Sequence, residues 1–233
     1  MLDKFSLQVS NLSHSYDNKI ALNNINWTLI SGNIYVLLGP NGAGKTTFLN
    51  LLANAIKPTS GSITLLSSEW ENINEFLQGN IGYLTEFPYY YSFLTTTEMI
   101  RLVGQLKGIE EELLEERITK WIDLFNLHEY RNQTMGSLSQ GTKKRVAFIS
   151  STIHQPKIIL LDEPTNGLDP EQIFLFRNVL KELSKAGALI LLSTHIMDLA
   201  EKLADNIGII RNNNLIYTGE NIKNLEELYF KIQ

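Results

Sequence analysis

Apolar and polar residues alternate near the start of the chain, which predicts two strands that each bury one face. Every second residue is apolar from Phe5 to Val9 and again from Ile25 to Leu29. A period of two places such side chains on one face of a strand. The polar segment from Tyr16 to Lys19 lies between the two runs. We therefore expect a pair of strands joined by a turn.

A second pattern begins with the short apolar run from Ile34 to Leu38, which stops at Gly39. Apolar residues from Lys45 to Ala53 then recur at helical intervals, so this part predicts a strand, a glycine loop and a helix. Strands and helices alternate again towards the end of the chain, and this alternation favours a mostly parallel sheet covered on both faces. The expected elements are a strand at 157–161, a helix at 173–184, a strand at 188–193, a helix at 197–204 and a strand at 207–210.

A mostly helical insert is predicted between these two regions, from about Thr95 to Ile153. Apolar residues form two stripes with helical spacing: Met99, Leu102, Val103 and Leu106, and then Leu113, Leu114, Ile118, Ile122 and Phe125. The glutamates between 110 and 116 are interpreted as the solvated face of a helix.

Composition excludes several classes of protein. At 233 residues with 43% hydrophobic and 19% charged residues, the chain suits one globular domain with an inserted subdomain. The net charge of -5 provides no basic field for nucleic acid, which we do not expect as a partner. The chain has no cysteine, its first nine residues lack a secretion signal, and no apolar run is long enough to span a bilayer. Any membrane role must therefore come through a partner.

The segment from Gly39 to Thr46 reads GPNGAGKT, which has glycine, lysine and threonine at the spacing of a phosphate-binding loop. Such a loop turns backbone N–H groups and a helix N-terminus towards phosphate oxygens. The alternative is a glycine loop that only joins a strand to a helix, but the lysine and threonine argue against it. We therefore expect ATP to contact Asn41, Gly42, Ala43, Gly44, Lys45, Thr46 and Thr47.

Two carboxylates follow the apolar run that ends at Leu161. Because neighbouring strand residues point to opposite sides, Asp162 and Glu163 can have different tasks. We expect Asp162 to hold Mg²⁺ together with Thr46, and Glu163 to polarise the attacking water. His195 follows the next apolar strand and is expected to contact the γ-phosphate, although an isolated histidine is often only a surface residue. The remaining histidines are interpreted as structural.

The segment from Leu138 to Thr142 reads LSQGT and resembles the signature sequence of ABC transporter nucleotide-binding domains. The resemblance covers nearly the whole chain. It implies that Ser139 and Gly141 cover the ATP bound by a second copy or a related ATPase subunit, although Ser139 also suits a helix N-cap. It further implies that Tyr16 stacks on adenine, with an ordinary loop tyrosine as the alternative, and that Gly167 to Pro170 form a dimer contact.

The same resemblance implies a fold class and a division of the chain. We expect an α/β protein with a P-loop NTPase core, a mostly parallel sheet, an N-terminal antiparallel β subdomain and an inserted helical subdomain. All 233 residues would form one ABC ATP-binding domain. The core would span about 1–86 and 155–233, and the helical subdomain, which contacts a membrane partner, about 87–154.

Two positions depart from the family pattern. Thr142 is shorter than the glutamine that usually closes the signature sequence. Glu86 stands where the family normally has a glutamine that contacts Mg²⁺ and the attacking water. A carboxylate binds Mg²⁺ more strongly but adds negative charge beside the γ-phosphate. We therefore expect Glu86 as a metal ligand, and we expect Glu86→Gln to keep ATP binding and change turnover.

Together these features predict an ATP-hydrolysing subunit of an ABC transporter that uses ATP and Mg²⁺. Its partner would be a separate transmembrane permease, it would lie in the cytoplasm on the inner face of the membrane, and export is preferred over import. Exposed aromatics between Phe87 and Phe93 would dock the permease. The alternatives are a soluble ABC-type ATPase and a non-hydrolysing regulatory module. The sequence does not identify the cargo.

Overall fold

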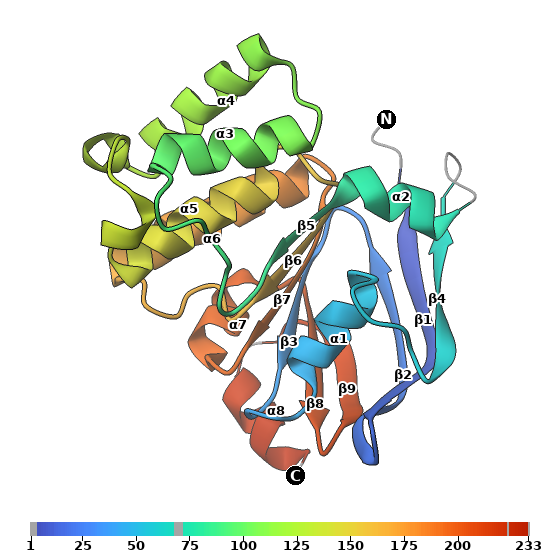
Figure 1. Cartoon of the computed structure of the whole chain (residues 1–233). Coiled ribbons are helices and arrows are strands. Elements are labelled where there is room, and N and C mark those ends of the chain that lie inside the picture. The colour runs from blue at the N-terminus through green and yellow to red at the C-terminus, as the bar shows by residue number, and fades with distance from the viewer. Residues whose placement is uncertain (1–3, 68–71, 223, 233) are drawn as a thin grey trace.

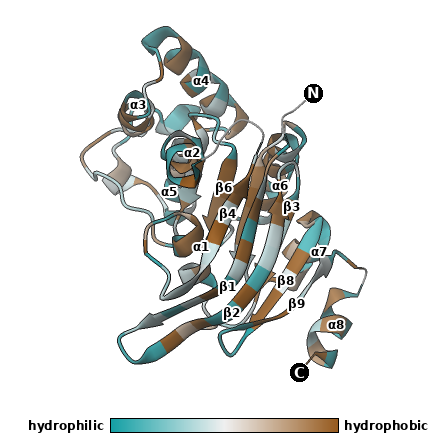
Figure 2. Cartoon of the chain, turned by 90° about the vertical axis from the view of Figure 1, so that its right-hand side faces the viewer, coloured by the Kyte–Doolittle hydropathy of each residue, from teal (hydrophilic) through white to brown (hydrophobic). Residues whose placement is uncertain are grey.

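The N-terminal part forms a three-stranded antiparallel sheet. A computed structural model describes residues 4–67, 72–222 and 224–232. In it, β1 (Ser6–Tyr16) pairs with β2 (Lys19–Ile30) across the predicted turn and with β4 (Ser60–Leu66) on its other side. Figure 2 shows β1 and β2 as bands of alternating hydropathy, which is the pattern that predicted them.

The second sheet has six strands in the order β5-β6-β7-β3-β8-β9. The first five are parallel and β9 is antiparallel, which confirms the mostly parallel sheet. The bounds are β5 Ile81–Leu84, β6 Ile158–Asp162, β7 Leu189–Thr194, β3 Ile34–Leu38, β8 Asn206–Arg211 and β9 Asn214–Glu220.

Both faces of this sheet are buried, as the uninterrupted apolar runs predict. Alternate residues of β3 enter two different hydrophobic clusters: Val36 packs in one and Leu37 in the other. One cluster lies between the sheet and both the helical insert and the C-terminal helices, and the other lies between the two sheets around α1 (Lys45–Leu52) and α2 (Ile73–Asn80). The strands are therefore held rigidly from both sides.

The predicted helical insert contains α3 (Thr96–Leu106), α4 (Glu111–Leu124) and α5 (Gln140–Thr152). Figure 1 shows these helices together on one side of the molecule, away from the three-stranded sheet. The stripe predicted for α3 is wrong at Leu106, whose side chain is 78% exposed. The buried face of α3 is centred on Ile100 and Gly104 instead, since Gly104 has no Cβ and Leu114 of α4 packs directly against it.

Three further helices follow in the C-terminal part, namely α6 (Pro170–Lys185), α7 (Met197–Leu203) and α8 (Leu225–Lys231). The helix α6 begins as its sequence predicts, because Asp169 accepts a hydrogen bond from the Gln172 N–H and Pro170 occupies the first turn. Within the described residues, no helix combines the length and the apolar character that crossing a membrane requires.

Candidate functional site

The C-terminal ends of the parallel strands place the predicted site residues at one edge of the sheet. Glycine-loop residues follow β3, Glu86 follows β5, the acidic pair ends β6 and His195 follows β7. A pocket of about 360 Å³ opens at this edge. It is lined by Tyr16, Lys19, Ile20, Ala21, Asn41, Gly42, Gly44, Lys45, Thr46, Thr47, Glu86, Asp162, Glu163 and Asn213.

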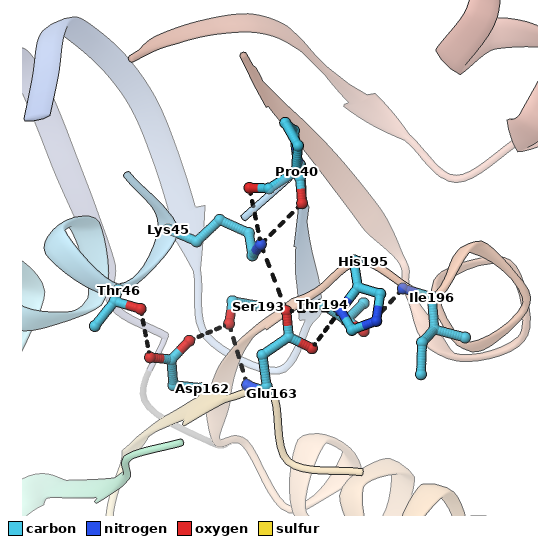
Figure 3. A network of polar contacts seen from close by, with 10 residues as sticks. Pro40, Lys45, Thr46, Asp162, Glu163, Ser193, Thr194, His195 and Ile196 are labelled. Carbon is cyan, nitrogen blue, oxygen red and sulfur yellow. Dashed lines mark hydrogen bonds and ion pairs between the residues drawn. The ribbon is translucent and has the colours of Figure 1, made fainter. Parts of the chain in front are cut away.

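The glycine loop has a backbone that only glycine adopts easily. Gly44 has a φ of +106°, and a Cβ at this position would lie 2.4 Å from the carbonyl oxygen of Ala21. The Lys45 side chain folds back over the loop, and its Nζ donates to the Gly39 carbonyl at 2.8 Å and to the Pro40 carbonyl at 3.3 Å (Figure 3). The loop therefore fixes a buried ammonium group at the edge of the pocket.

Asp162 lies next to the first turn of α1. The Thr46 hydroxyl donates to Asp162 Oδ2 at 2.7 Å, and Ser193 of β7 donates to Asp162 Oδ1 (Figure 3). The carboxylate is therefore oriented from both sides. Thr46 and Asp162 present hard oxygen atoms to the pocket, and Glu86 lines the same pocket. Such a donor set suits Mg²⁺, which prefers oxygen ligands and takes few of them from protein.

Glu163 is held in an unusual backbone conformation. Its φ of 44° lies in the left-handed region, which residues other than glycine rarely adopt. The side chain is buried, and its Oε1 lies 3.4 Å from Lys45 Nζ. Its backbone N–H donates a hydrogen bond to the Ser193 hydroxyl at 3.2 Å. Backbone strain of this kind persists where the surrounding structure enforces it, often at functional sites.

His195 contacts Glu163 directly. Its Nδ1 lies 3.1 Å from both carboxylate oxygens, and the ring is about half exposed (Figure 3). A proton on Nδ1 would form the hydrogen bond to the carboxylate. The structure thus joins the two residues predicted to be catalytic into one pair.

Three predicted ligand residues lie outside the lining of this pocket. The side chain of Ala43 packs in the hydrophobic cluster between the two sheets, and its backbone N–H donates to the Pro40 carbonyl at 3.3 Å. Ser139 and Gly141 lie at the N-terminus of α5. Ser139 caps this helix, as the alternative interpretation predicted, by accepting a hydrogen bond from the Thr142 N–H at 3.2 Å. Thr142 is buried and bonds to Ser139 and Arg145, so its hydroxyl faces inwards.

Tyr16 stands at the end of β1 with 48% of its surface exposed. The ring of His14 packs edge-on against it, with ring centroids 4.6 Å apart. The pocket wall beside it is completed by Lys19, Ile20, Ala21 and Asn213. These residues were not predicted, because nothing in the local sequence marks them. Asn213 joins the site from the turn between β8 and β9, where its side-chain amide donates to the Ala21 carbonyl at 2.8 Å.

A buried lysine that is not part of the pocket lining contacts the lining residue Glu86. Lys144 of α5 donates from Nζ to the carbonyl oxygen of Glu86 at 2.8 Å. Burial lowers the pKa of Lys144, while the nearby carboxylates of Glu86, Asp162 and Glu163 oppose that shift by favouring the charged amine. No role for this lysine was predicted from the sequence.

This arrangement defines a P-loop nucleoside triphosphatase, because a lysine-bearing glycine loop faces an acidic strand end across a mostly parallel sheet. The profile of the ABC transporter family matches residues 22–166. The chain therefore belongs to the ABC transporter ATP-binding family, and it is an ATPase of that family.

Known relatives extend the match over nearly the whole chain. The lantibiotic transport ATP-binding protein SrtF of Streptococcus pyogenes is 35% identical, over 96% of this chain and 95% of the relative. The Nod factor export ATP-binding protein I of Sinorhizobium fredii is 32% identical, over 92% of this chain and 62% of the relative. The solved structure of an ATP-binding subunit of an ABC transporter has a TM-score of 0.88 at 28% identity, covering 97% of this chain and 98% of that one.

Proposed function

We propose that this ATPase drives transport through a separate membrane subunit and that the pocket at the sheet edge is its ATP site. The observation that carries the proposal is the network of Lys45, Thr46, Asp162 and Glu163, which concentrates an ammonium, a hydroxyl and two carboxylates around one pocket. In this proposal Lys45 and the glycine loop bind the phosphates, while Tyr16 lies against the adenine.

Thr46 and Asp162 would hold Mg²⁺, with Glu86 as a third oxygen ligand. When bound, the metal neutralises part of the phosphate charge. Glu163 would accept the proton of the attacking water, because its carboxylate is fixed by Lys45 and His195. His195 would hold that carboxylate in place through the N–H at Nδ1, and in its doubly protonated form it would also donate from Nε2 towards the γ-phosphate.

A second copy of the chain, or a related ATPase subunit, would complete each ATP site. Ser139 and Gly141 lie at the N-terminus of a 13-residue helix, which favours a bound anion. Gly141 is also packed so closely that a Cβ would lie 2.8 Å from the carbonyl oxygen of Gly167. Any residue larger than glycine would disturb this contact with the loop that follows the acidic pair.

Ser139 provides a test that separates capping from a contact with the partner's nucleotide. Ser139→Ala is expected to lower the free energy of unfolding by about 1 kcal/mol, because the cap of α5 is lost. Ser139→Asp retains a good cap but places a negative charge where the partner's phosphates would lie. We expect the Asp variant to melt like the wild type and to lose ATP-dependent dimers in light scattering. Normal dimers of the Asp variant would contradict the contact in trans.

An apolar groove is the proposed docking site for a transmembrane permease. It has a volume of about 410 Å³ and lies between β5, α3 and α5, with Leu84, Met99 and Val103 among its lining residues. Three exposed rings follow one another from its rim: Tyr89 packs edge-on against Tyr91, and Tyr91 packs against Phe93 with the rings tilted. Exposed aromatic clusters of this kind are typical of interaction sites. Docking would hold the chain at the cytoplasmic face of the membrane.

Export is proposed because the relative from Sinorhizobium fredii is named for export.

Pull-down from detergent-solubilised membranes tests this partner. The wild type is expected to retain a subunit with several transmembrane helices, whereas Tyr89→Asp with Phe93→Asp should lose it, because two exposed aromatic contacts become charged. Phe230→Asp on α8 is the control, since Phe230 is 55% exposed and lies far along the chain from the groove. If the wild type retains no membrane protein, or if the double variant retains it fully, the proposal is wrong. The first result would favour the soluble ABC-type ATPase.

A further inference from the structure

Two neighbouring lysines of α5 hold the segment that carries Glu86. Lys144 donates to the Glu86 carbonyl at 2.8 Å, and Lys143 lies over the ring of Tyr90 with 5.1 Å between Nζ and the ring centroid. Both lysine side chains are buried, with 6% and 9% of their surfaces exposed. The segment therefore has fixed contacts to the helix that begins directly after Ser139.

The position of Lys144 has an electrostatic consequence at the ATP pocket. Glu86, Asp162 and Glu163 line that pocket, and Lys144 Nζ lies 2.8 Å from the carbonyl oxygen of Glu86. Lys45 is already engaged with Glu163. An ammonium group held at this position acts on the carboxylates of the pocket through a protein interior that screens charge less than water does.

The sequence supplies the reason why such a charge is needed. Glu86 adds a third carboxylate to those of Asp162 and Glu163 in the lining of the pocket, so the place for the γ-phosphate carries a concentrated negative charge. Repulsion between this carboxylate and a phosphate would push the Glu86 side chain away from the reaction. The ammonium group of Lys144, which bonds to the Glu86 carbonyl and is not part of the pocket lining, offsets that repulsion without occupying the pocket.

We propose that Lys144 is a positioning residue for ATP hydrolysis, whose buried charge offsets the carboxylate of Glu86 and whose hydrogen bond fixes the Glu86 backbone at the pocket wall. The proposal rests on the proposed ATP site but does not depend on the docking of a permease, because hydrolysis can be measured on the purified ATPase. It makes Glu86 and Lys144 one functional pair.

A double-mutant cycle tests the pair. Lys144→Gln removes the charge but keeps a donor for the Glu86 carbonyl, and it is expected to lower kcat about tenfold with KM for ATP changed less than about twofold. In a Glu86→Gln background the same change should lower kcat by no more than about twofold, because the carboxylate that needed the charge is gone. Lys144→Arg should keep most of the wild-type kcat, since it retains the charge.

A measurement without nucleotide tests the hydrogen bond. Lys144→Met removes both the charge and the donor, so amide hydrogen exchange in residues 85–91 is expected to become faster, whereas Lys144→Gln should stay close to the wild type. Lys143→Met is the matched control. It removes a neighbouring buried lysine that contacts Tyr90, and its effect on kcat should be the same with Glu86 and with Gln at position 86.

Two results would overturn the proposal. One is an equal loss of kcat for Lys144→Gln in both backgrounds, which would make Lys144 a structural anchor. The other is a wild-type kcat for Lys144→Gln beside intact Glu86. Thermal melting of each variant shows whether the chain is folded, and Lys144→Arg keeps the test open if the uncharged variants do not fold.

Discussion

Replacing Glu163 with glutamine is expected to slow ATP hydrolysis by about a hundredfold or more while ATP binding is kept. The amide has nearly the same shape as the carboxylate, so the strained backbone and the contact with Ser193 can persist. It cannot accept a proton from water, however, and this role belongs to the transition state. Binding should not weaken, because the change removes a negative charge 3.4 Å from Lys45. With ATP, we therefore expect a stable dimer in light scattering.

The control for this variant is Glu182→Gln. Glu182 is exposed on α6, and its side chain pairs with Lys185 at the surface, so its replacement should leave hydrolysis unchanged. A hydrolysis rate of Glu163→Gln within about twofold of the wild type would show that another group activates the water. A variant that binds ATP and stays monomeric would instead contradict the shared site.

Removing the side chain of Lys45 is expected to raise the Kd for ATP by about a hundredfold, which corresponds to about 2.7 kcal/mol. The ammonium is held in place by the carbonyls of Gly39 and Pro40, so its position does not need to be organised when phosphate binds. Lys45→Ala loses a charge-assisted contact to phosphate and leaves the buried Glu163 carboxylate without its cation. Isothermal titration with ATP measures the change.

Stability must be measured beside affinity for this position, because an unpaired buried carboxylate destabilises the fold. Lys45→Met keeps the aliphatic stem and is the second variant, with the same expected loss of binding. Lys185→Ala, at an exposed lysine on α6, is the control. An unchanged Kd in a folded Lys45→Met protein would exclude the glycine loop as the phosphate site.

The class of this protein, a P-loop ATPase, could be predicted from short segments of its sequence. A strand, a glycine loop and a helix are adjacent in the chain. The segment from Gly39 to Thr46 therefore predicts a phosphate site without information from other parts of the sequence. The acidic pair could likewise be recognised from one apolar run and two carboxylates. The alternation of apolar residues predicted the strands β1 and β2 and the turn between them, because burial of one face needs only a period of two. The family was recognised from the signature sequence and then shown by comparison.

Some features were predicted poorly because they depend on contacts between distant residues. The strands β4, β5 and β9 were not predicted individually, and the order of the six-stranded sheet could not be, because strand pairing joins segments far apart in sequence. The stripe on α3 was misplaced at Leu106 because the site of closest packing is set by Gly104 against Leu114.

The chain by itself thus specified the chemical groups that handle ATP, since their spacing is short and their residue types are distinctive. Only the tertiary structure decided which neighbours hold them. Asn213 reaches the pocket from a distant turn, and Lys144 reaches Glu86 across 58 positions of sequence. His195 pairs with Glu163 because β6 and β7 are adjacent and parallel. The physical reason is that local periodicity encodes burial, whereas contacts between elements arise only when the whole core packs.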